Sequence, residues 1–334
     1  MPDLLNDPDG RAVSVQPAAG QGGWRARLGL WSDDRRVEAS VIGIALIVAV
    51  SLPFWAAVNQ MFFWETVLVQ VLFATSVNLL IGNADMPSFG QAAFFGIGAY
   101  SLAIMNEHVN FALAIMTAVA IAGLAGAVFG FAIRRLSGLA FAMVTLAIAQ
   151  MLYLIAMQSN FLGGENGLPN VFPGTLAPNQ IWYLLLACTV VGVAFFWLIG
   201  KSPLGSALRG MRDDPVRLTA LGANLRTLRV LAFVLAACGA GLAGALFAYA
   251  NGIVTTDSLY WTQSGLPIFM AIIGGVRNFW GPAIGAVILT SLTNYLSDRT
   301  DSYILPLGIL LAMVVIFLPQ GVLGLLRSWR RAGA

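Results

Sequence analysis

The chain has 334 residues, of which 58% are hydrophobic and only 10% are charged, and its formal net charge is +3. Soluble domains carry about 25% charged residues, so this composition, with a mean hydropathy of +0.81, excludes an ordinary soluble protein. It predicts a chain whose solvent is the lipid bilayer.

The N-terminal segment 1–40 is polar and of mixed charge, and its first apolar run starts only near Val41. This pattern does not match a secretory signal peptide. Trp24, Leu28 and Trp31 recur at helical spacing, with arginines between them. Two interpretations stay open, a helix that lies on the membrane surface and a partly ordered tail.

Ten apolar segments follow, and we expect each to be a membrane-spanning helix. They cover roughly residues 41–58, 62–80, 87–105, 111–133, 139–158, 181–199, 230–250, 263–275, 281–296 and 303–318. A helix needs about 20 residues to cross the hydrocarbon. The segments at 263–275 and 281–296 are short, and glycines and Pro282 bound them.

The positive charges set the expected orientation. With a cytoplasmic N-terminus and ten spans, all of the 18 lysines and arginines except Arg299 fall on the cytoplasmic side, as the positive-inside rule requires. We therefore predict that both termini are cytoplasmic. The expected division is a tail over 1–40, a transmembrane domain over 41–318 and a second cytoplasmic tail over 319–334.

The spans hold almost no ionisable groups. Glu65 is the single exception, and it lies about one turn from the outer end of its segment. Proton-coupled carriers and membrane enzymes need carboxylate or histidine clusters, so we expect neither a proton relay nor a catalytic site. Gly200-Lys201-Ser202 resembles the end of a nucleotide-binding loop but follows an apolar helix and lacks the required upstream glycine.

Cysteine and histidine usage predicts no metal site and no bound cofactor. Cys188 and Cys238 lie inside apolar runs, and the single histidine, His108, lies in a short polar break with no ligand spacing around it. A disulfide framework is likewise not indicated.

The longest interior connection, residues 200–229, is basic and amphipathic. Asp214 is a suitable N-cap, Pro215 suits the first helical position and Gly222 suits the position after the last turn. These residues predict a short helix in which Arg217 lies beside an apolar face. It is either a connector on the membrane surface or a docking helix for a soluble partner.

Five blocks resemble, in order and spacing, the permeases of branched-chain amino acid ABC transporters. They are VNLLIGNADMPSFGQAAFFGIGAYSLAIM (77–105), LAFAMVTLAIAQML (139–152), GGENGLP (163–169), SPLGSALRGMRDDPVRLTALGANLRTLRVLAFVLAACGAGLAGALFAY (202–249) and IIGGVRNFWGPAIGAVIL (272–289). The cytoplasmic N-terminal tail is more similar to the M-type than to the H-type of these permeases.

The resemblance implies an all-α permease of the bacterial inner membrane, with the ten-helix fold of the vitamin B12 importer permease. It implies a heterodimer with a homologous permease, two ATPase subunits that hydrolyse the ATP, and a periplasmic substrate-binding protein. The lipid bilayer is the remaining partner, and no nucleic acid is involved. It also places the ATPase-coupling helix at about 213–222, with Arg212, Asp213, Asp214, Arg217, Leu221 and Gly222 as candidate coupling residues.

A pore between two permeases is the expected substrate path. Pro87–Gly90 is the best candidate for a broken helix, whose ends carry partial charge suited to a zwitterion. Trp280-Gly281-Pro282-Ala283 echoes Phe89-Gly90-Gln91-Ala92 and hints at an internal repeat. Candidate polar residues of the path are Asn78, Ser88, Gln91, Thr145 and Gln150. Each could instead form a hydrogen bond between helices.

The loop with Glu165 and Asn166 is expected to face the periplasm, either as a contact for the binding protein or as a flexible turn. Three alternative functions remain at this stage. The same architecture could import urea or short amides, the chain could be a stand-alone channel or secondary carrier, or it could be a membrane enzyme. The last two lack the ionisable groups that they require.

Overall fold

The computed structural model describes residues 43, 47–54, 57–106, 108–169, 171, 177–299, 304–317 and 321–324. The chain forms two compact units, Met1–Trp55 and Ala56–Ala334. In the first unit, the described residues are helical and include the 3-10 turn η1 (Leu52–Phe54). The amphipathic pattern around Trp24 and the predicted domain boundaries at 40/41 and 318/319 lie outside the described residues.

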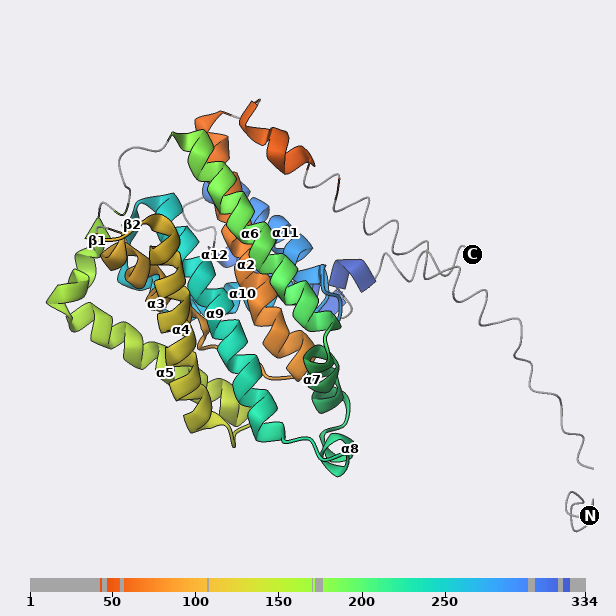
Figure 1. Cartoon of the computed structure of the whole chain (residues 1–334). Coiled ribbons are helices and arrows are strands. Elements are labelled where there is room, and N and C mark those ends of the chain that lie inside the picture. Colours follow the sequence, from red (N-terminus) through yellow and green to blue (C-terminus); the bar gives the residue numbers. More distant parts are fainter. Residues whose placement is uncertain are drawn as a thin grey trace, which may run out of the picture. The chain divides into compact units, whose positions relative to one another are not determined.

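The second unit is built from helices that run back and forth (Figure 1). They are α2 (Val58–Asn78), α3 (Gln91–Met105), α4 (Phe111–Ile133), α5 (Gly138–Gln158), α6 (Pro178–Lys201), α7 (Pro203–Asp213), α8 (Pro215–Ala220), α9 (Leu225–Asn251), α10 (Trp261–Gly274), α11 (Gly281–Ser297) and α12 (Ile304–Phe317). The prediction of an all-α membrane protein is confirmed in this architecture.

Five of these helical stretches are long and apolar enough to cross a bilayer: Gln60–Asn83, Phe111–Ile133, Gly138–Gln158, Pro178–Lys201 and Leu225–Asn251. The protein itself buries 78% of the most apolar part of the first and 61% of the last. The corresponding shares for α4, α5 and α6 are 28%, 22% and 33%. Helix α9 and the stretch Gln60–Asn83, which contains α2, are therefore central. Helices α4, α5 and α6 instead present wide apolar faces of the kind that suits lipid.

Helix α3 has only 15 residues, yet most of its side chains are buried. A helix rises about 1.5 Å per residue, so α3 is too short to cross the hydrocarbon. Its packing explains how a short helix is tolerated at this depth, because backbone that is enclosed by protein does not face lipid. The predicted apolar segment 87–105 is thus helical only from Gln91 onward.

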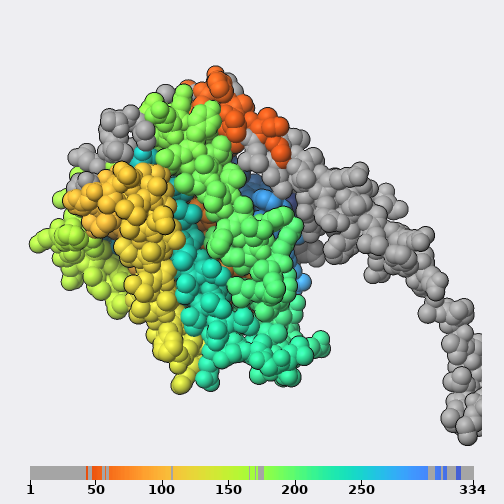
Figure 2. All heavy atoms as spheres, in the orientation of Figure 1, coloured from red at the N-terminus to blue at the C-terminus, as the bar shows by residue number. Residues whose placement is uncertain are grey.

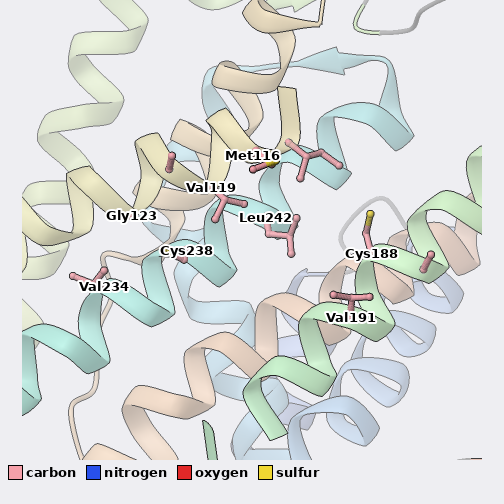
Figure 3. Close-up of a pocket in the computed structure, with 11 residues that line it drawn as sticks. Met116, Val119, Gly123, Cys188, Val191, Val234, Cys238 and Leu242 are labelled. Atoms are coloured by element: carbon pink, nitrogen blue, oxygen red, sulfur yellow. The ribbon is translucent and has the colours of Figure 1, made fainter. Parts of the chain in front are cut away.

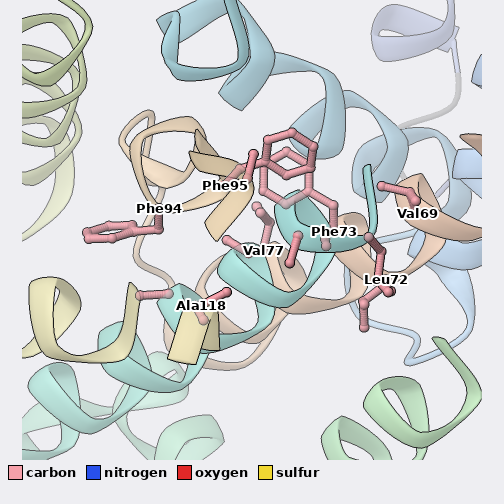
Figure 4. Close-up of a cluster of buried hydrophobic side chains, with 14 of the residues drawn as sticks. Val69, Leu72, Phe73, Val77, Phe94, Phe95 and Ala118 are labelled. Atoms are coloured by element: carbon pink, nitrogen blue, oxygen red, sulfur yellow. The ribbon is translucent and has the colours of Figure 1, made fainter. Parts of the chain in front are cut away.

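The core forms where α2, α3, α4 and α9 meet, and Figure 4 shows side chains of this cluster. The rings of Phe73 and Phe95 lie 4.8 Å apart, and those of Phe94 and Phe233 lie 5.3 Å apart. Glycines bring the backbones together, since a Cβ built on Gly98 would overlap the backbone of Gly241. Close backbone approach through small residues is the usual basis of helix packing in lipid.

Two pairs of glycines spaced four residues apart, the GxxxG pattern, lie at helix contacts. Gly126 and Gly130 of α4 face Ala237 and Phe233 of α9, so this pair joins two neighbouring helices of the core. The pair at the start of α11, Gly281 and Gly285, lies against the backbone of α10. The contact of α10 with α11 anchors a second apolar cluster that also includes α2 and α12.

The two ends of this helical unit differ in character. At one end, the strands β1 (Leu168–Pro169) and β2 (Ile253–Val254) pair antiparallel and join the α5–α6 connection to the α9–α10 connection. At the opposite end, α7 and α8 lie between α6 and α9 (Figure 1). Residues 200–229 and the glycine-rich loop 163–167 therefore lie at opposite ends of this unit.

Candidate functional site

The connection between α2 and α3 departs from regular helix in several ways. Helix α2 changes into the π-helical turn η2 (Leu79–Asn83), and residues 85–90 are not helical. Asp85 adopts φ +52°, the only positive φ of a non-glycine residue among those described. π-helical turns are frequent at functional sites, and left-handed backbone at a non-glycine residue is costly unless the surroundings enforce it.

This break lies within the depth of the membrane helices. Gly90 packs against Thr145, because a Cβ at Gly90 would come within 2.8 Å of the Thr145 carbonyl oxygen. Thr145 is the eighth residue of α5, so it lies roughly 10 Å along that helix. The N-terminus of α3 is therefore buried inside the bundle. Non-helical backbone at such depth requires partners from the protein.

Hydroxyl groups supply these partners. The backbone N–H of Phe89 donates to Thr145 Oγ1 over 3.2 Å, and that of Gly90 donates to Ser88 Oγ over 3.3 Å. The N–H of Ala92 donates to Ser264 Oγ of α10 over 2.7 Å. Ser88, Thr145 and Ser264 are all buried. The start of α3 is thus surrounded by a neutral polar cluster contributed by three segments of the chain.

Gln91 is the first residue of α3, and its side chain is fully buried. Neither atom of its amide has a hydrogen-bond partner among the described residues. An unsatisfied buried amide is costly, and native proteins normally supply it with a partner. The amide is therefore a vacant donor and acceptor pair at the end of a buried helix. Its chemistry matches a polar, uncharged or zwitterionic ligand.

The structure thus brings together three of the five polar residues that the sequence singled out, Ser88, Gln91 and Thr145. Asn78 lies at the end of α2, where its side chain faces Gly82, and Gln150 lies further along α5. The side-chain oxygens of both amides are buried without a partner in the described part of the chain. Ser264 was not predicted, because its only signal was a serine near the start of a short apolar segment.

We expect Thr145→Val to lower the stability of the break. Valine keeps the shape of threonine but removes the oxygen that accepts the Phe89 N–H, and a buried donor without an acceptor costs about 1–3 kcal/mol. The melting temperature of the purified protein should fall by a few degrees. Thr117→Val is the control, since the one partner of the Thr117 hydroxyl in the described part of the chain is Ala114 of its own helix. Equal shifts in the two variants would contradict this role for Thr145.

The α6–α9 connection forms two helices rather than one. The Ser202 hydroxyl caps α7 by accepting the Gly205 N–H over 3.3 Å, and the Asp214 carboxylate caps α8 by accepting the Arg217 N–H over 2.9 Å. Gly222 has φ +87° and ends α8 with backbone bonds typical of a glycine cap. The short helix predicted from the sequence is confirmed, whereas α7 had not been predicted.

Helix α8 projects at the end of the helical unit (Figures 1 and 2). Val216 and Leu221 are 78% and 79% exposed, although neither is polar. The Arg217 side chain is also exposed, and it pairs with Asp214 over 3.4 Å. Asp213 is exposed as well, whereas Arg212 is largely covered. Apolar and charged groups on one small protruding helix form a surface suited to a protein partner.

The glycine-rich loop lies at the other end. Glu165 and Asn166 belong to the 3-10 turn η4 (Gly164–Asn166), and Asn166 is exposed. Gly167 has φ +70° and packs against the backbone of Val254 in β2. The loop is therefore held by the strand pair on at least one side.

An apolar groove of about 690 Å³ lies between α4 and α6, with α9 behind it (Figures 2 and 3). Val119, Val191 and Leu242 line it, together with the two cysteines, Cys188 and Cys238. It offers almost no polar surface. The groove therefore suits hydrocarbon and not a polar metabolite.

Comparison with known proteins gives a family match. The profile of the family described as "Branched-chain amino acid transport system / permease component" matches residues 61–318. The high-affinity branched-chain amino acid transport system permease protein LivM of Escherichia coli K12 is 26% identical over 330 residues, which cover 88% of this chain and 77% of the relative.

Two further relatives match with a lower identity or over a smaller part of the chain. The probable branched-chain amino acid transport permease protein LivH of Methanocaldococcus jannaschii is 24% identical, over 78% of this chain and 90% of the relative. The autoinducer 2 import system permease protein LsrC of Escherichia coli DH10B is 29% identical, but over only 44% of this chain and 43% of its own. No solved structure matches.

Proposed function

Since this chain belongs to the family of branched-chain amino acid transport system permease components, we propose that it is one membrane subunit of an ATP-driven importer of branched-chain amino acids. The break between α2 and α3 carries the proposal. It places a capped helix N-terminus and the Gln91 amide, which has no partner among the described residues, at depth inside a bundle of membrane helices. Substrate sites of many transporters are built around such discontinuous helices.

In this proposal the energy for transport comes from partner subunits. Gly200-Lys201-Ser202 lies where α6 gives way to α7, so it is not a phosphate-binding loop between a strand and a helix. Helix α8, with its exposed Val216, Arg217 and Leu221, is the surface on which two ATPase subunits would act. In this proposal α8 faces the cytoplasm, and the chain lies in the bacterial inner membrane with both termini cytoplasmic.

The importer would be a heterodimer of permeases. The relatives include proteins named LivM and LivH, which favours a homologous, H-type permease as the partner. A periplasmic binding protein would deliver the substrate at the opposite end, where Glu165 and Asn166 lie in the loop beside β2. The ten-helix fold of the vitamin B12 importer permease remains part of this proposal.

The mechanism that we propose is alternating access at the interface of the two permeases. ATP binding by the partners would move α8 and the helices attached to it, and the break at 85–90 would let α2 and α3 change their relative tilt. The polar cluster of Ser88, Gln91, Thr145 and Ser264 is neutral, and it suits a zwitterion whose own charges compensate each other. Asn78 and Gln150 would lie along the same path.

The experiment that tests this function measures uptake of labelled leucine and labelled urea into proteoliposomes. The vesicles hold this chain with its candidate partner permease, ATPases and binding protein. We expect leucine uptake that requires ATP and every partner. ATP-dependent uptake of urea without leucine would keep the architecture and change the substrate to urea or short amides. Uptake by this chain alone, indifferent to ATP, would refute the importer-subunit proposal and indicate a channel or carrier.

A further inference from the structure

The five arginines of residues 200–229 fall into two groups. Arg217 and Arg226 have exposed side chains. The other three donate to backbone carbonyl groups near the ends of membrane helices. Arg209 donates to Gly200 at the end of α6, Arg212 to Gly82 in η2, and Arg229 to Leu136 between α4 and α5. Cations favour the C-terminal ends of helices, where carbonyl groups lack partners.

The bond of Arg212 spans the longest stretch of sequence among these three. It joins residues 130 positions apart and links α7 to the π-helical end of α2. Helix α7 also contacts η2 and α9, and it buries Leu208 and Met211. The Arg212 side chain is 21% exposed, and the Asp213 carboxylate accepts from its Nε and lies 2.9 Å from its Nη2. The guanidinium is therefore fixed between a carboxylate and a helix end.

Gly82 lies where the end of α2 meets the connection between α10 and α11. A Cβ built there would come 2.5 Å from the Val276 carbonyl oxygen, in the connection between α10 and α11, and 2.6 Å from Asn78 Oδ1. Gly82 is buried. A force applied at Gly82 therefore acts on the end of α2, on the start of the α10–α11 connection and on the Asn78 side chain, whose amide oxygen has no partner among the described residues.

We propose that Arg212 is a positioning residue that transmits movement of α8 to the π-helical end of α2. The inference rests on the proposed function, because it assumes that ATPase subunits move α8. It changes the role expected for Arg212, which the sequence placed among the residues that contact the ATPases. Arg212 instead faces the membrane helices, and its planar guanidinium bonds the Gly82 carbonyl through Nη1 while Nε and Nη2 face the Asp213 carboxylate.

The test compares Arg212→Gln, Arg212→Lys and Arg226→Gln in the complete complex in proteoliposomes. Three quantities are measured: co-purification of the ATPases, the rate of ATP hydrolysis, and the number of leucine molecules taken up per ATP. For Arg212→Gln we expect unchanged assembly, hydrolysis within about twofold of wild type, and uptake per ATP lowered about tenfold. Lysine should restore part of the uptake, and Arg226→Gln should match wild type.

The outcomes distinguish a transmission role of Arg212 from a role in docking the ATPases. Unchanged uptake per ATP in Arg212→Gln would refute the transmission role. Loss of the ATPases from an otherwise intact permease pair would show that Arg212 is a docking contact instead. Should the glutamine variant fail to fold, the lysine variant decides, and wild-type uptake per ATP in it would also refute the proposal. A wild-type complex without ATP-dependent leucine uptake would refute the proposed function itself, which is a separate result.

Discussion

Replacement of Gly98 with alanine is expected to destabilise the chain by about 3 kcal/mol, the upper part of the usual range for overpacked cores. The added Cβ would overlap the backbone of Gly241, so α3 and α9 would have to move apart. Gly244 already packs against the backbone of Phe95 in the same contact, which leaves little room for α3 to shift. Helix α3 holds Gln91, so the displacement would also reach the polar cluster.

Gly308→Ala is the matched control for this prediction. Gly308 also lies in a helix, α12, but it is exposed, and a Cβ added there would meet no described atom within 4 Å. Alanine there should leave stability unchanged or raise it by about 0.5–1 kcal/mol, because alanine loses less conformational freedom in a helix than glycine does. Melting temperatures of the purified variants, measured in one detergent, provide the comparison. Similar melting temperatures for the two variants would contradict the close α3–α9 contact.

Charge reversal of Arg217 should separate the permease from its ATPases. The side chain is 81% exposed and its described partner is the Asp214 carboxylate on the same helix. Surface substitutions of this kind leave folding stability nearly unchanged, whereas a central interface residue contributes about 2–4 kcal/mol to binding. We therefore expect Arg217→Glu to fold normally, to lose its ATPases on purification and to lower uptake about 30-fold or more.

Arg226→Glu provides the matched control for Arg217→Glu. Both arginines are exposed and belong to the same connection, but Arg226 lies in the first turn of α9, beyond the α8 surface. The control should retain both the ATPases and transport. A complex of Arg217→Glu that keeps its ATPases and its uptake would remove α8 from the docking role. The short helix would then be a connector on the membrane surface, the other interpretation that its sequence allowed.

Hydropathy and local helix capping explain why the helix positions could be predicted from the sequence. Long apolar segments locate the helices, because a helix that crosses the bilayer needs about 20 consecutive, mostly apolar residues. The boundaries of α8 follow from Asp214, Pro215 and Gly222, because caps act within one turn. The break before α3 was also visible, and both Phe89-Gly90 and Trp280-Gly281 directly precede or begin helices, α3 and α11. These features are all local in the chain.

The candidate site is different, because its contacts join distant residues. Ser264 bonds Ala92 across 172 positions, and Arg212 bonds Gly82 across 130. No local pattern marks either pair, and the charge of Arg212 by itself indicates only the side of the membrane. By itself the sequence determined the membrane class, most helix positions and the capped short helix α8. Only the tertiary structure decided which hydroxyls bond the backbone around the start of α3 and which arginine bonds η2, because those bonds depend on how the helices pack.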